Sequence, residues 1–412
     1  MEEIENNLEE NNSLMNIKSS YILKHVFDFL NQKRLLNIIR YNKSYQERVD
    51  ININNYIEEY KKIIIEIIPS EQTFYYFIND SNKDYEFHFF INNKTEELKR
   101  NFIIQSDKAK IIKVILDGEI KSLSGLFKNC VYIKKINFIQ FNNENIIDMS
   151  YLFYECSALE EISLTKVKTK NVINMEYMFS GCQALKEIDV SKFDTNKVTN
   201  MSHMFHRCNS LKSLNLSNFN TENVLDMKNM FNYCESLQDI NISSFNTKKV
   251  REFCFMFHEC SSLKELNLSN FNNENVFDMC YMFYGCSSLI KLNIFNFTNN
   301  NVSNMCGLFH ECKSLKEIDL QNFRTDKASN LSYMFKCCEN LQELNLINFT
   351  TKLVTDMSDM FSGCSSLKKL DISNFSANLE TNIKHMFENC SSLKNLIVSD
   401  TYIKSEYNNL KL

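Results

Sequence analysis

The stretch Val276-Phe-Asp-Met-Cys-Tyr-Met-Phe-Tyr-Gly-Cys-Ser-Ser-Leu-Ile-Lys-Leu-Asn-Ile-Phe-Asn-Phe297 sets the pattern of the chain, because nearly everything from residue 120 to residue 400 restates it. Cysteines recur every 26 residues without insertion or deletion, and a Phe stands three residues before each. These register cysteines are Cys130, Cys156, Cys182, Cys208, Cys234, Cys260, Cys286, Cys312, Cys338, Cys364 and Cys390. Such a period predicts one small unit stacked along an axis, each copy burying its apolar side on the next.

Each unit has two apolar patterns. After the cysteine, the spacing L-x-x-L-x-L of Leu263, Leu266 and Leu268 predicts a strand with one buried face. Further on, apolar residues at i, i+3, i+6, i+7 and i+10 predict a short helix. An Asp or Asn before the first Met, such as Asp278, would accept hydrogen bonds from the first N–H groups of that helix.

The consensus M-x-x-M-F-x-x-C-S-S-L-K-x-L-x-L-S-N-F-N-T-x-x-V resembles the BspA-like leucine-rich repeats of bacterial and protist surface proteins, and eleven copies cover about two thirds of the chain. The resemblance implies an α/β leucine-rich-repeat solenoid of about eleven 26-residue strand-helix repeats. Because strands stack at about 4.8 Å and helices at about 8 to 10 Å, we expect an arc or horseshoe with the strands on its inside. The family's bacterial members are typically secreted adhesins that bind host or neighbouring-cell proteins.

Two rows of Phe, one at each register Phe and one eleven residues after the cysteine, are expected to form the core with the register cysteines as buried free thiols. Four further cysteines are Cys254, Cys280, Cys306 and Cys337. On helices packed about 8 to 10 Å apart, they would be too distant for disulfides, so free thiols are expected here as well.

Composition excludes several classes of function. The net charge of −5 argues against nucleic-acid binding, which needs a clustered basic face. No apolar run is long enough to span a membrane. The acidic start Met1-Glu-Glu-Ile-Glu5 does not resemble a signal peptide, so a cytoplasmic location is expected.

The chain divides into five predicted segments. They are an acidic disordered tail (1–16), a helical pair (17–49), a mixed α+β amino-terminal cap (50–118), the repeats (119–400) and a short polar carboxy-terminal cap without a helix (401–412). Within the amino-terminal cap, Ile111 to Leu116 stands one period before the first full repeat and is expected to pair with its strand.

The helical pair resembles the opening of an F-box, in which a leucine-rich helix hairpin binds the Skp1 adaptor of a ubiquitin ligase. Lys18 stands where the F-box has Pro, and the later Trp is missing. The resemblance implies adaptor binding by one apolar stripe, which comprises Ile22, Leu23, Val26, Phe27 and Leu30. The alternative is a helix pair that only packs on the end of the solenoid.

Each position of the repeat forms a row of side chains along the solenoid. A binding site should appear where the residues of a row depart from their usual type. On the strand face, an Asn row (Asn215, Asn241, Asn267) and a Ser row (Ser191, Ser217, Ser243, Ser269) are expected to hydrogen-bond between copies. Phe295 and Ile347 interrupt the Ser row and Ile290 stands where Lys is usual, so these three residues form a candidate protein-binding patch. Aromatic rows on the outer face (Tyr151, Tyr177, His203, Phe255, Tyr281, Tyr333; Tyr154, His206, His258, Tyr284, His310) could form a second docking surface.

No catalytic motif, cofactor site or metal site is predicted. The sequence lacks a glycine-rich phosphate loop, G-x-S-x-G and H-E-x-x-H, and His206, His258 and His310 are two repeats apart. The leading hypothesis is a non-enzymatic scaffold that binds a protein on its concave sheet, with an F-box-like substrate receptor as its sharper form. The alternative is a cell-surface adhesin, against which stand the acidic start and the sequons Asn215-Leu-Ser217, Asn241-Ile-Ser243 and Asn267-Leu-Ser269 on the binding face.

Overall fold

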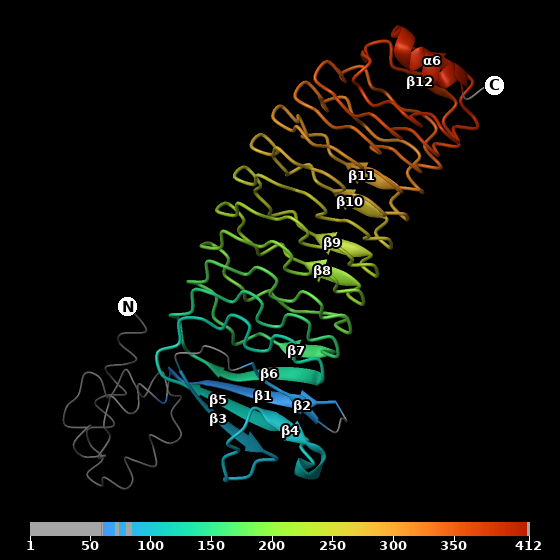
Figure 1. The fold of residues 1–412 in the computed structure, drawn as a ribbon. Helices are drawn as coiled ribbons and strands as arrows, with labels where there is room; N and C mark the ends of the chain where they lie inside the picture. Colours follow the sequence, from blue (N-terminus) through green and yellow to red (C-terminus); the bar gives the residue numbers. More distant parts are fainter. Residues whose placement is uncertain (1–58, 60, 71–73, 80–84, 410–412) are drawn as a thin grey trace, which may run out of the picture.

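The computed structural model describes residues 59, 61–70, 74–79 and 85–409. Figure 1 shows an elongated, gently curved stack of coils with a small sheet at its amino-terminal end. Ten parallel bridges connect successive coils in one column, from Ser122 with Asp148 to Asp356 with Asn382. The predicted leucine-rich-repeat solenoid with a 26-residue spacing is therefore confirmed. The tail 1–16 and the F-box-like pair 17–49 lie outside the described residues, so both remain predictions.

One side of the coils, here called the strand side, carries short strands that begin five residues after a register cysteine. Strands β10 (Glu265–Asn267) and β11 (Lys291–Asn293) pair in parallel, with Leu266 opposite Leu292. The other three-residue strands of the coils are β7 (Glu161–Ser163), β8 (Ser213–Asn215), β9 (Asp239–Asn241), β12 (Lys369–Asp371) and β13 (Asn395–Ile397). The leucine spacing thus predicted this half of the unit correctly.

The opposite side, here called the turn side, spans the eight residues before each register cysteine and the cysteine itself. The predicted helix is absent, since no α-helix occurs between residues 119 and 400, a range that the structure describes in full. In the coil that ends at Cys286, the N–H of Tyr281 donates to the carbonyl of Cys306 in the next coil at 2.8 Å. The N–H of Met282 instead donates within its own coil, to the carbonyl of Met279 at 3.3 Å. Alternate N–H groups therefore donate to the next coil, whereas in an α-helix they would donate to carbonyls four residues earlier in the same segment.

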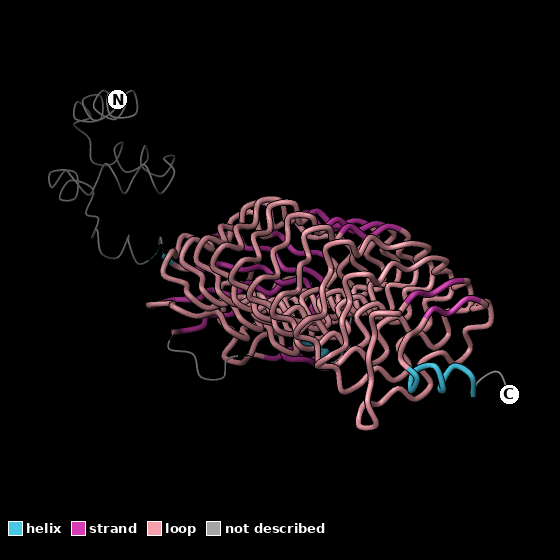
Figure 2. Tube along the Cα trace, turned by 90° about the horizontal axis from the view of Figure 1, so that it is seen from above, coloured by secondary structure: helices cyan, strands magenta, loops and turns pink. Residues whose placement is uncertain are grey.

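Two residues with positive φ in each coil explain why the turn side cannot be a helix. They stand five residues and one residue before the register cysteine, as Tyr281 (φ 53°) and Gly285 (φ 70°) do. A right-handed helix has negative φ throughout. A succession of tight turns still places Met279, Met282 and Phe283 inward, so it imitates a helical period. Figure 2 shows turns and loops making up most of the coil backbone.

The Asp or Asn predicted as a helix cap instead begins a turn. Asp278 Oδ1 accepts a hydrogen bond from the N–H of Cys280 at 2.8 Å, and Asn304 Oδ1 accepts one from the N–H of Cys306 at 3.2 Å. This is the Asx turn, in which a side-chain oxygen binds the backbone two residues on. The same row forms the column of parallel bridges, so it marks where the chain enters the turn side.

The Phe rows and ten of the eleven register cysteines are buried in the core as predicted, and Cys390 in the last coil is partly buried. Cys234 is fully buried, and its Sγ donates to the carbonyl of Phe205 in the preceding coil at 3.2 Å. Ten of the eleven register cysteines make this contact. Burial raises the pKa of Cys234 to about 12. The thiol therefore stays protonated and serves as a hydrogen-bond donor as well as filling space.

Both sides of the coil stack at similar spacing. On the turn side, the ring centroids of Phe231 and Phe257 lie 5.3 Å apart, and on the strand side those of Phe323 and Phe349 lie 5.6 Å apart. Wide helices were the predicted cause of curvature, and in their absence that cause does not apply. The bend in Figure 1 is gentle, and backbone hydrogen bonds connect the coils on both the turn side and the strand side.

A mainly antiparallel sheet covers the amino-terminal end of the stack, with one parallel pair where it joins the coils. The sheet has the strand order β3-β5-β1-β6-β7, and β6 also forms the strand of the first coil. Besides β7, the sheet contains β1 (Ile63–Pro69), β3 (Glu86–Ile91), β5 (Ile112–Asp117) and β6 (Ile133–Phe141). A separate pair is formed by β2 (Phe74–Tyr76) and β4 (Phe102–Ile104). A 3₁₀ turn (Gln105–Asp107) follows β4. The expected pairing of β5 with the first repeat is wrong, because β1 lies between them and pairs with both.

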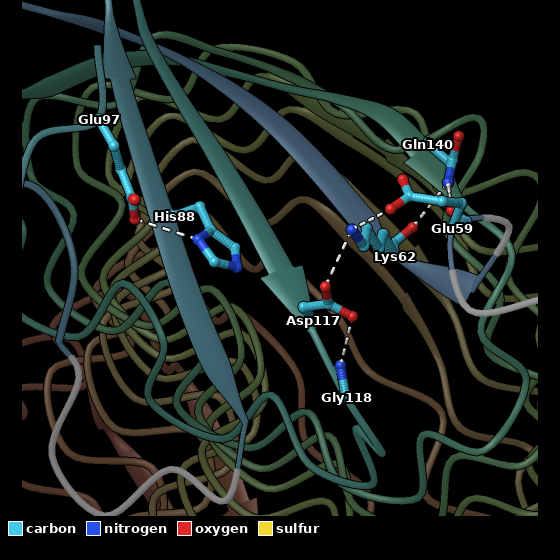
Figure 3. Close-up of polar contacts among 7 residues, drawn as sticks. All are labelled: Glu59, Lys62, His88, Glu97, Asp117, Gly118 and Gln140. Carbon is cyan, nitrogen blue, oxygen red and sulfur yellow. Dashed lines mark hydrogen bonds and ion pairs between the residues drawn. The ribbon is translucent and has the colours of Figure 1, made fainter. Parts of the chain in front are cut away.

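Polar contacts fix the start of β1 between its two neighbours (Figure 3). Lys62 Nζ forms an ion pair with Asp117 Oδ2 at the end of β5 at 2.9 Å and contacts Glu59 on its other side. Gln140 Nε2 in β6 donates to the carbonyls of Glu59 and Lys62, both at 3.0 Å. Separately, Glu97 Oε1 contacts His88 Nδ1 on β3 at 3.0 Å. Covering β6 in this way leaves no open edge at the first coil.

The carboxy-terminal end is covered by α6 (Thr401–Asn409), where no helix was expected. Asp400 Oδ1 accepts hydrogen bonds from the N–H groups of Tyr402 (2.9 Å) and Ile403 (3.0 Å), which is a helix N-cap. Ile403 is fully buried, and the ring of Tyr407 packs on Phe387 with centroids 5.6 Å apart. Among the described residues, no helix is long and apolar enough to cross a membrane.

Candidate protein-binding face

The strand face comprises the exposed side chains from the fourth to the ninth residue after each register cysteine. The side chains of its Asn and Asp row were expected to hydrogen-bond between coils. They instead accept hydrogen bonds from backbone N–H groups of their own coil and form turns. Asn293 Oδ1 accepts from the N–H of Phe295 at 3.2 Å, and Asn345 Oδ1 accepts from the N–H of Ile347 at 3.1 Å. These turns fix the backbone that presents the ninth-position side chains.

The side-chain ladder between coils lies at the tenth position after the register cysteine, three positions beyond the Asn and Asp row. Asn270 Nδ2 donates to the carbonyls of Ile242 (3.0 Å) and Phe245 (2.9 Å) in the preceding coil. Asn218 and Asn374 make the same pair of contacts in their coils. The strand face is therefore held by backbone and amide contacts that leave its ninth-position side chains free to vary.

The three residues of the predicted patch are all exposed, with exposed fractions of 48% for Ile290, 53% for Phe295 and 75% for Ile347. Ile290 and Phe295 belong to one coil, and Ile347 lies two coils further in the row of Phe295. At the usual strand spacing, that offset corresponds to roughly 10 Å. The structure thus places the three side chains on one face, with Gln321 between Phe295 and Ile347.

Two polar hollows that the sequence did not reveal flank the patch. The first, of about 470 Å³, has a lining that includes Asn296 next to Phe295, together with Glu274 and Asn300. The second, of about 490 Å³, has a lining that includes Asn345, Glu343 and Lys369. Exposed apolar side chains beside polar hollows are the arrangement of a protein-binding surface, in which an apolar centre is surrounded by polar groups.

The electrostatic character of this face is mixed. The second hollow also contains Glu317 and Asp371. Hydrogen bonding from Ser373 lowers the pKa of Asp371, so its carboxylate stays ionised. On the first coils, Lys135 of β6 and Glu161 of β7 form an ion pair across the sheet. Charges of both signs next to an apolar patch favour a protein partner over a nucleic acid.

The outer aromatic rows, predicted as a second docking surface, contact one another extensively. Tyr177 stacks on His203 with centroids 4.1 Å apart, and His258 stacks on Tyr284 at 4.6 Å. Burial lowers the pKa of His203 and of His258 to about 4. These rings therefore stabilise the turn side as stacked ladders, and their role in docking remains a prediction.

Sequence reasoning missed two further groups of exposed apolar residues. One row precedes the bridge column and comprises Ile147, Ile173, Leu225 and Phe277, each 44 to 47% exposed. The other comprises Leu353 (57% exposed) and Leu379 (89% exposed) in the last coils. Leu353 could have been recognised, because the same row holds Lys249, Asn275, Asn301 and Lys327.

The residues that could hold a metal ion differ from those considered in the sequence. His258 Nδ1 contacts Asn232 Oδ1 at 3.0 Å, so the histidine row is interleaved with other side chains. Within the described part of the chain, the group of potential ligands that converge is Cys254, Asp278 and Cys280.

The stack of short parallel strands and turns, buried Leu and Phe rows and capped ends defines a repeat solenoid of the leucine-rich-repeat type. The family described as "Mycoplasma protein of unknown function, DUF285" matches residues 121–239, 210–318 and 303–406. The chain belongs to this family, which supports the BspA-like resemblance of the repeats.

Two solved structures are similar to this chain at low sequence identity. A leucine-rich cell surface protein from Faecalibacterium prausnitzii A2-165 is 18% identical, with 72% of this chain and 86% of that chain covered and a TM-score of 0.36. The TLR13–ssRNA13 complex is 16% identical, with 67% of this chain and 48% of that chain covered and a TM-score of 0.24. A comparison with curated proteins found no significant match.

Proposed function

We propose that this protein is a non-enzymatic interaction scaffold that binds a protein partner across its strand face, with Phe295, Ile290 and Ile347 as anchors. The observation that supports this proposal is the exposure of these three side chains in rows where other coils carry Ser and Lys. An exposed apolar side chain that breaks a polar row gains most when a partner removes it from water.

The surroundings of the patch support the same function. Asx turns and coil-to-coil amide contacts hold the backbone at Phe295 and Ile347. A rigid surface loses little conformational entropy on binding, so more of the contact energy becomes affinity. The polar hollows beside the patch would supply the hydrogen-bonding rim that surrounds the apolar centre of an interface.

The decisive variant combines Ile290→Lys, Phe295→Ser and Ile347→Ser. Each substitution installs the residue that neighbouring coils carry in that row, as Lys264, Ser269 and Ser373 do, so the fold should be retained. The matched control, Leu353→Lys with Leu379→Lys, removes exposed apolar surface from another row. Partners would be captured with the full chain as bait in its native cells, and direct binding then measured with the purified partner.

We expect the triple variant to lose a partner that the control retains, with affinity weakened by roughly 30-fold or more, as for the loss of an anchor worth about 2 kcal/mol. Equal capture by both variants would refute the proposed face. Loss with both variants would extend binding beyond the strand face and contradict the patch as its centre.

Two finer forms of this function rest on the sequence. As an F-box-like receptor, the chain would bind a Skp1-like adaptor through Ile22, Leu23, Val26, Phe27 and Leu30; a Leu23→Asp, Phe27→Asp variant should then lose co-precipitation of Skp1. As an adhesin-like protein of the BspA type, it would be labelled on intact cells by a reagent that does not cross membranes. Labelling of the intact cell surface would contradict the receptor form, and Skp1 capture would contradict the adhesin form.

A further inference from the structure

Three cysteines in successive coils stand in one row, six residues before their register cysteines: Cys254, Cys280 and Cys306. The sequence predicted that helix packing would hold them apart. The turn side has no helices, and the N–H of Phe255 donates to the carbonyl of Cys280 at 3.0 Å. Coils joined by backbone hydrogen bonds bring side chains of one row close together, so neighbouring thiols can share a ligand.

Two of these thiols converge with a carboxylate. The sulfurs of Cys254 and Cys280 and an oxygen of Asp278 all lie within 4.8 Å of one another. Cys254 is only 9% exposed, whereas Cys280 is half-buried, so the group lies just below the surface with one open side.

The carboxylate of Asp278 is already oriented. Its Oδ1 accepts from the N–H of Cys280 at 2.8 Å, and its Oδ2 accepts from Asn304 Nδ2 at 3.0 Å. Each carboxylate oxygen can accept a further bond, so these contacts leave capacity for a cation. Outer contacts of this kind commonly fix a ligating carboxylate in place.

The neighbouring groups of the row are engaged elsewhere. Cys306 Sγ donates to Tyr281 Oη at 3.3 Å and accepts from Ser332 Oγ at 3.2 Å. Lys228, one coil before Cys254, forms an ion pair with Asp226 at 3.2 Å.

We propose that Cys254, Cys280 and Asp278 form a binding site for a thiophilic divalent cation, with Zn²⁺ as the best-matched ion. Two sulfur ligands and one carboxylate oxygen are a donor set that suits Zn²⁺ and excludes the hard cations Mg²⁺ and Ca²⁺. Tetrahedral coordination with Zn–S bonds of about 2.3 Å requires sulfurs about 3.8 Å apart. A separation of that size falls within the 4.8 Å that bounds the ligand atoms of the observed group, and a water molecule would complete the fourth position.

The chain contains an oxygen counterpart of this site three coils further on. Ser332, Asp356 and Ser358 occupy the same three positions of the repeat as Cys254, Asp278 and Cys280. Asp356 Oδ1 accepts from the N–H of Ser358 at 2.8 Å, as Asp278 does from Cys280. This group has the same backbone arrangement without thiols, so it provides a control within the same molecule.

The test is zinc binding by the reduced full chain, measured by competition with a chromophoric chelator, and by Co²⁺ substitution followed through thiolate-to-cobalt absorption. We expect one tight ion per chain, a thiolate absorption band and a rise in thermal stability with zinc. The Cys254→Ser, Cys280→Ser variant and the Asp278→Asn variant test the ligands. Serine is native to this row at Ser332 and Ser358, and Asn is native to the row of Asp278 at Asn304, so both variants should fold.

The double serine variant should lose the tight ion and the cobalt band, and Asp278→Asn should weaken binding at least tenfold. The controls Asp356→Asn and Cys306→Ser should bind as the wild type does. Equal binding by the double serine variant, an equal loss with Cys306→Ser, or failure of the reduced wild type to bind any zinc would each overturn the proposal. Circular dichroism without metal would show that the variants keep the fold, so that a loss of binding reports on the ligands.

Discussion

The two sides of each coil differ in how strictly they are built. On the turn side, the Cys, Met and Phe columns are buried, and backbone hydrogen bonds run both within and between coils, as for Met282 and Tyr281. On the strand side, short strands and Asx turns hold the backbone while exposed positions such as Phe295 change from coil to coil. The difference teaches that the turn side specifies the solenoid, whereas the strand side tolerates changes in its exposed side chains.

The same substitution on the two sides gives the largest expected contrast. Phe231 is fully buried on the turn side between two other Phe rings, with centroids 6.0 Å and 5.3 Å away. Phe231→Ala should lower the free energy of unfolding by about 3 to 5 kcal/mol, through lost burial and the cavity left behind. Phe295→Ala on the strand side should change it by less than about 0.5 kcal/mol. Chemical denaturation of both variants measures the contrast, which would fail if the two losses were similar.

A smaller effect is expected at the edge where the coil leaves the strand side. Thr221 is fully buried, and its hydroxyl donates to the carbonyl of Asn246 at 2.9 Å while it accepts from the N–H of the same residue at 2.7 Å. Thr221→Val keeps the shape but removes two part-buried hydrogen bonds to the backbone of Asn246, a loss of about 1 to 3 kcal/mol in total.

Thr199→Val is the matched control for this prediction, because that hydroxyl makes a long, exposed contact of 3.4 Å. Denaturation curves should place Thr199→Val within about 0.5 kcal/mol of the wild type. A Thr221→Val variant as stable as this control would mean that the threonine contacts do not join the coils.

The period, the inward cysteine and Phe rows and the strand could be predicted from the sequence, because each is a matter of spacing. The helix was wrong because tight turns also place Met279, Met282 and Phe283 on one side. A signal was available: five of the six glycines stand five or one residues before a register cysteine (Gly125, Gly181, Gly285, Gly307 and Gly363), where positive φ is required. Asn129 and Asn229 occupy the same positions.

The proposed patch and the cysteine group differ in how far the sequence could predict them. The exposure of Phe295 and Ile347 could be predicted because exposure follows from the row, whatever the distance between coils. Whether Cys254 and Cys280 approach each other depends on that distance, and a stack of helices would have held them apart. The pairing of β1 between β5 and β6 was equally inaccessible, since long-range register is not encoded in local periodicity.

Acid should weaken the turn side selectively. Burial lowers the pKa of His206 and His258 to about 4 from an ordinary value of 6.5. Between these values the unfolded chain binds protons that the folded chain does not, so stability is fully present above pH 6.5 and falls as the pH drops toward 4. The His206→Asn, His258→Asn variant carries the residue found at Asn232 in the same row, and it should lose less stability than the wild type between pH of about 7.5 and about 5. Unfolding curves at both values test this, and an equal loss would assign the acid sensitivity to other groups.

The smallest expected effect compares the backbone conformation of the turn side with that of the strand side at exposed positions outside the core. Arg207 is exposed on the turn side with φ of 58°, whereas the exposed Lys212 precedes β8 and has no positive φ. Glycine adopts positive φ without strain, and a β-branched residue does so at a cost of about 1 to 2 kcal/mol. Arg207→Gly should therefore be more stable than Arg207→Val. At Lys212 the order should reverse, because valine favours extended backbone and glycine loses more entropy on folding. Thermal unfolding of the four variants measures both orders, and the same order at both positions would show that the two sides do not differ in backbone conformation.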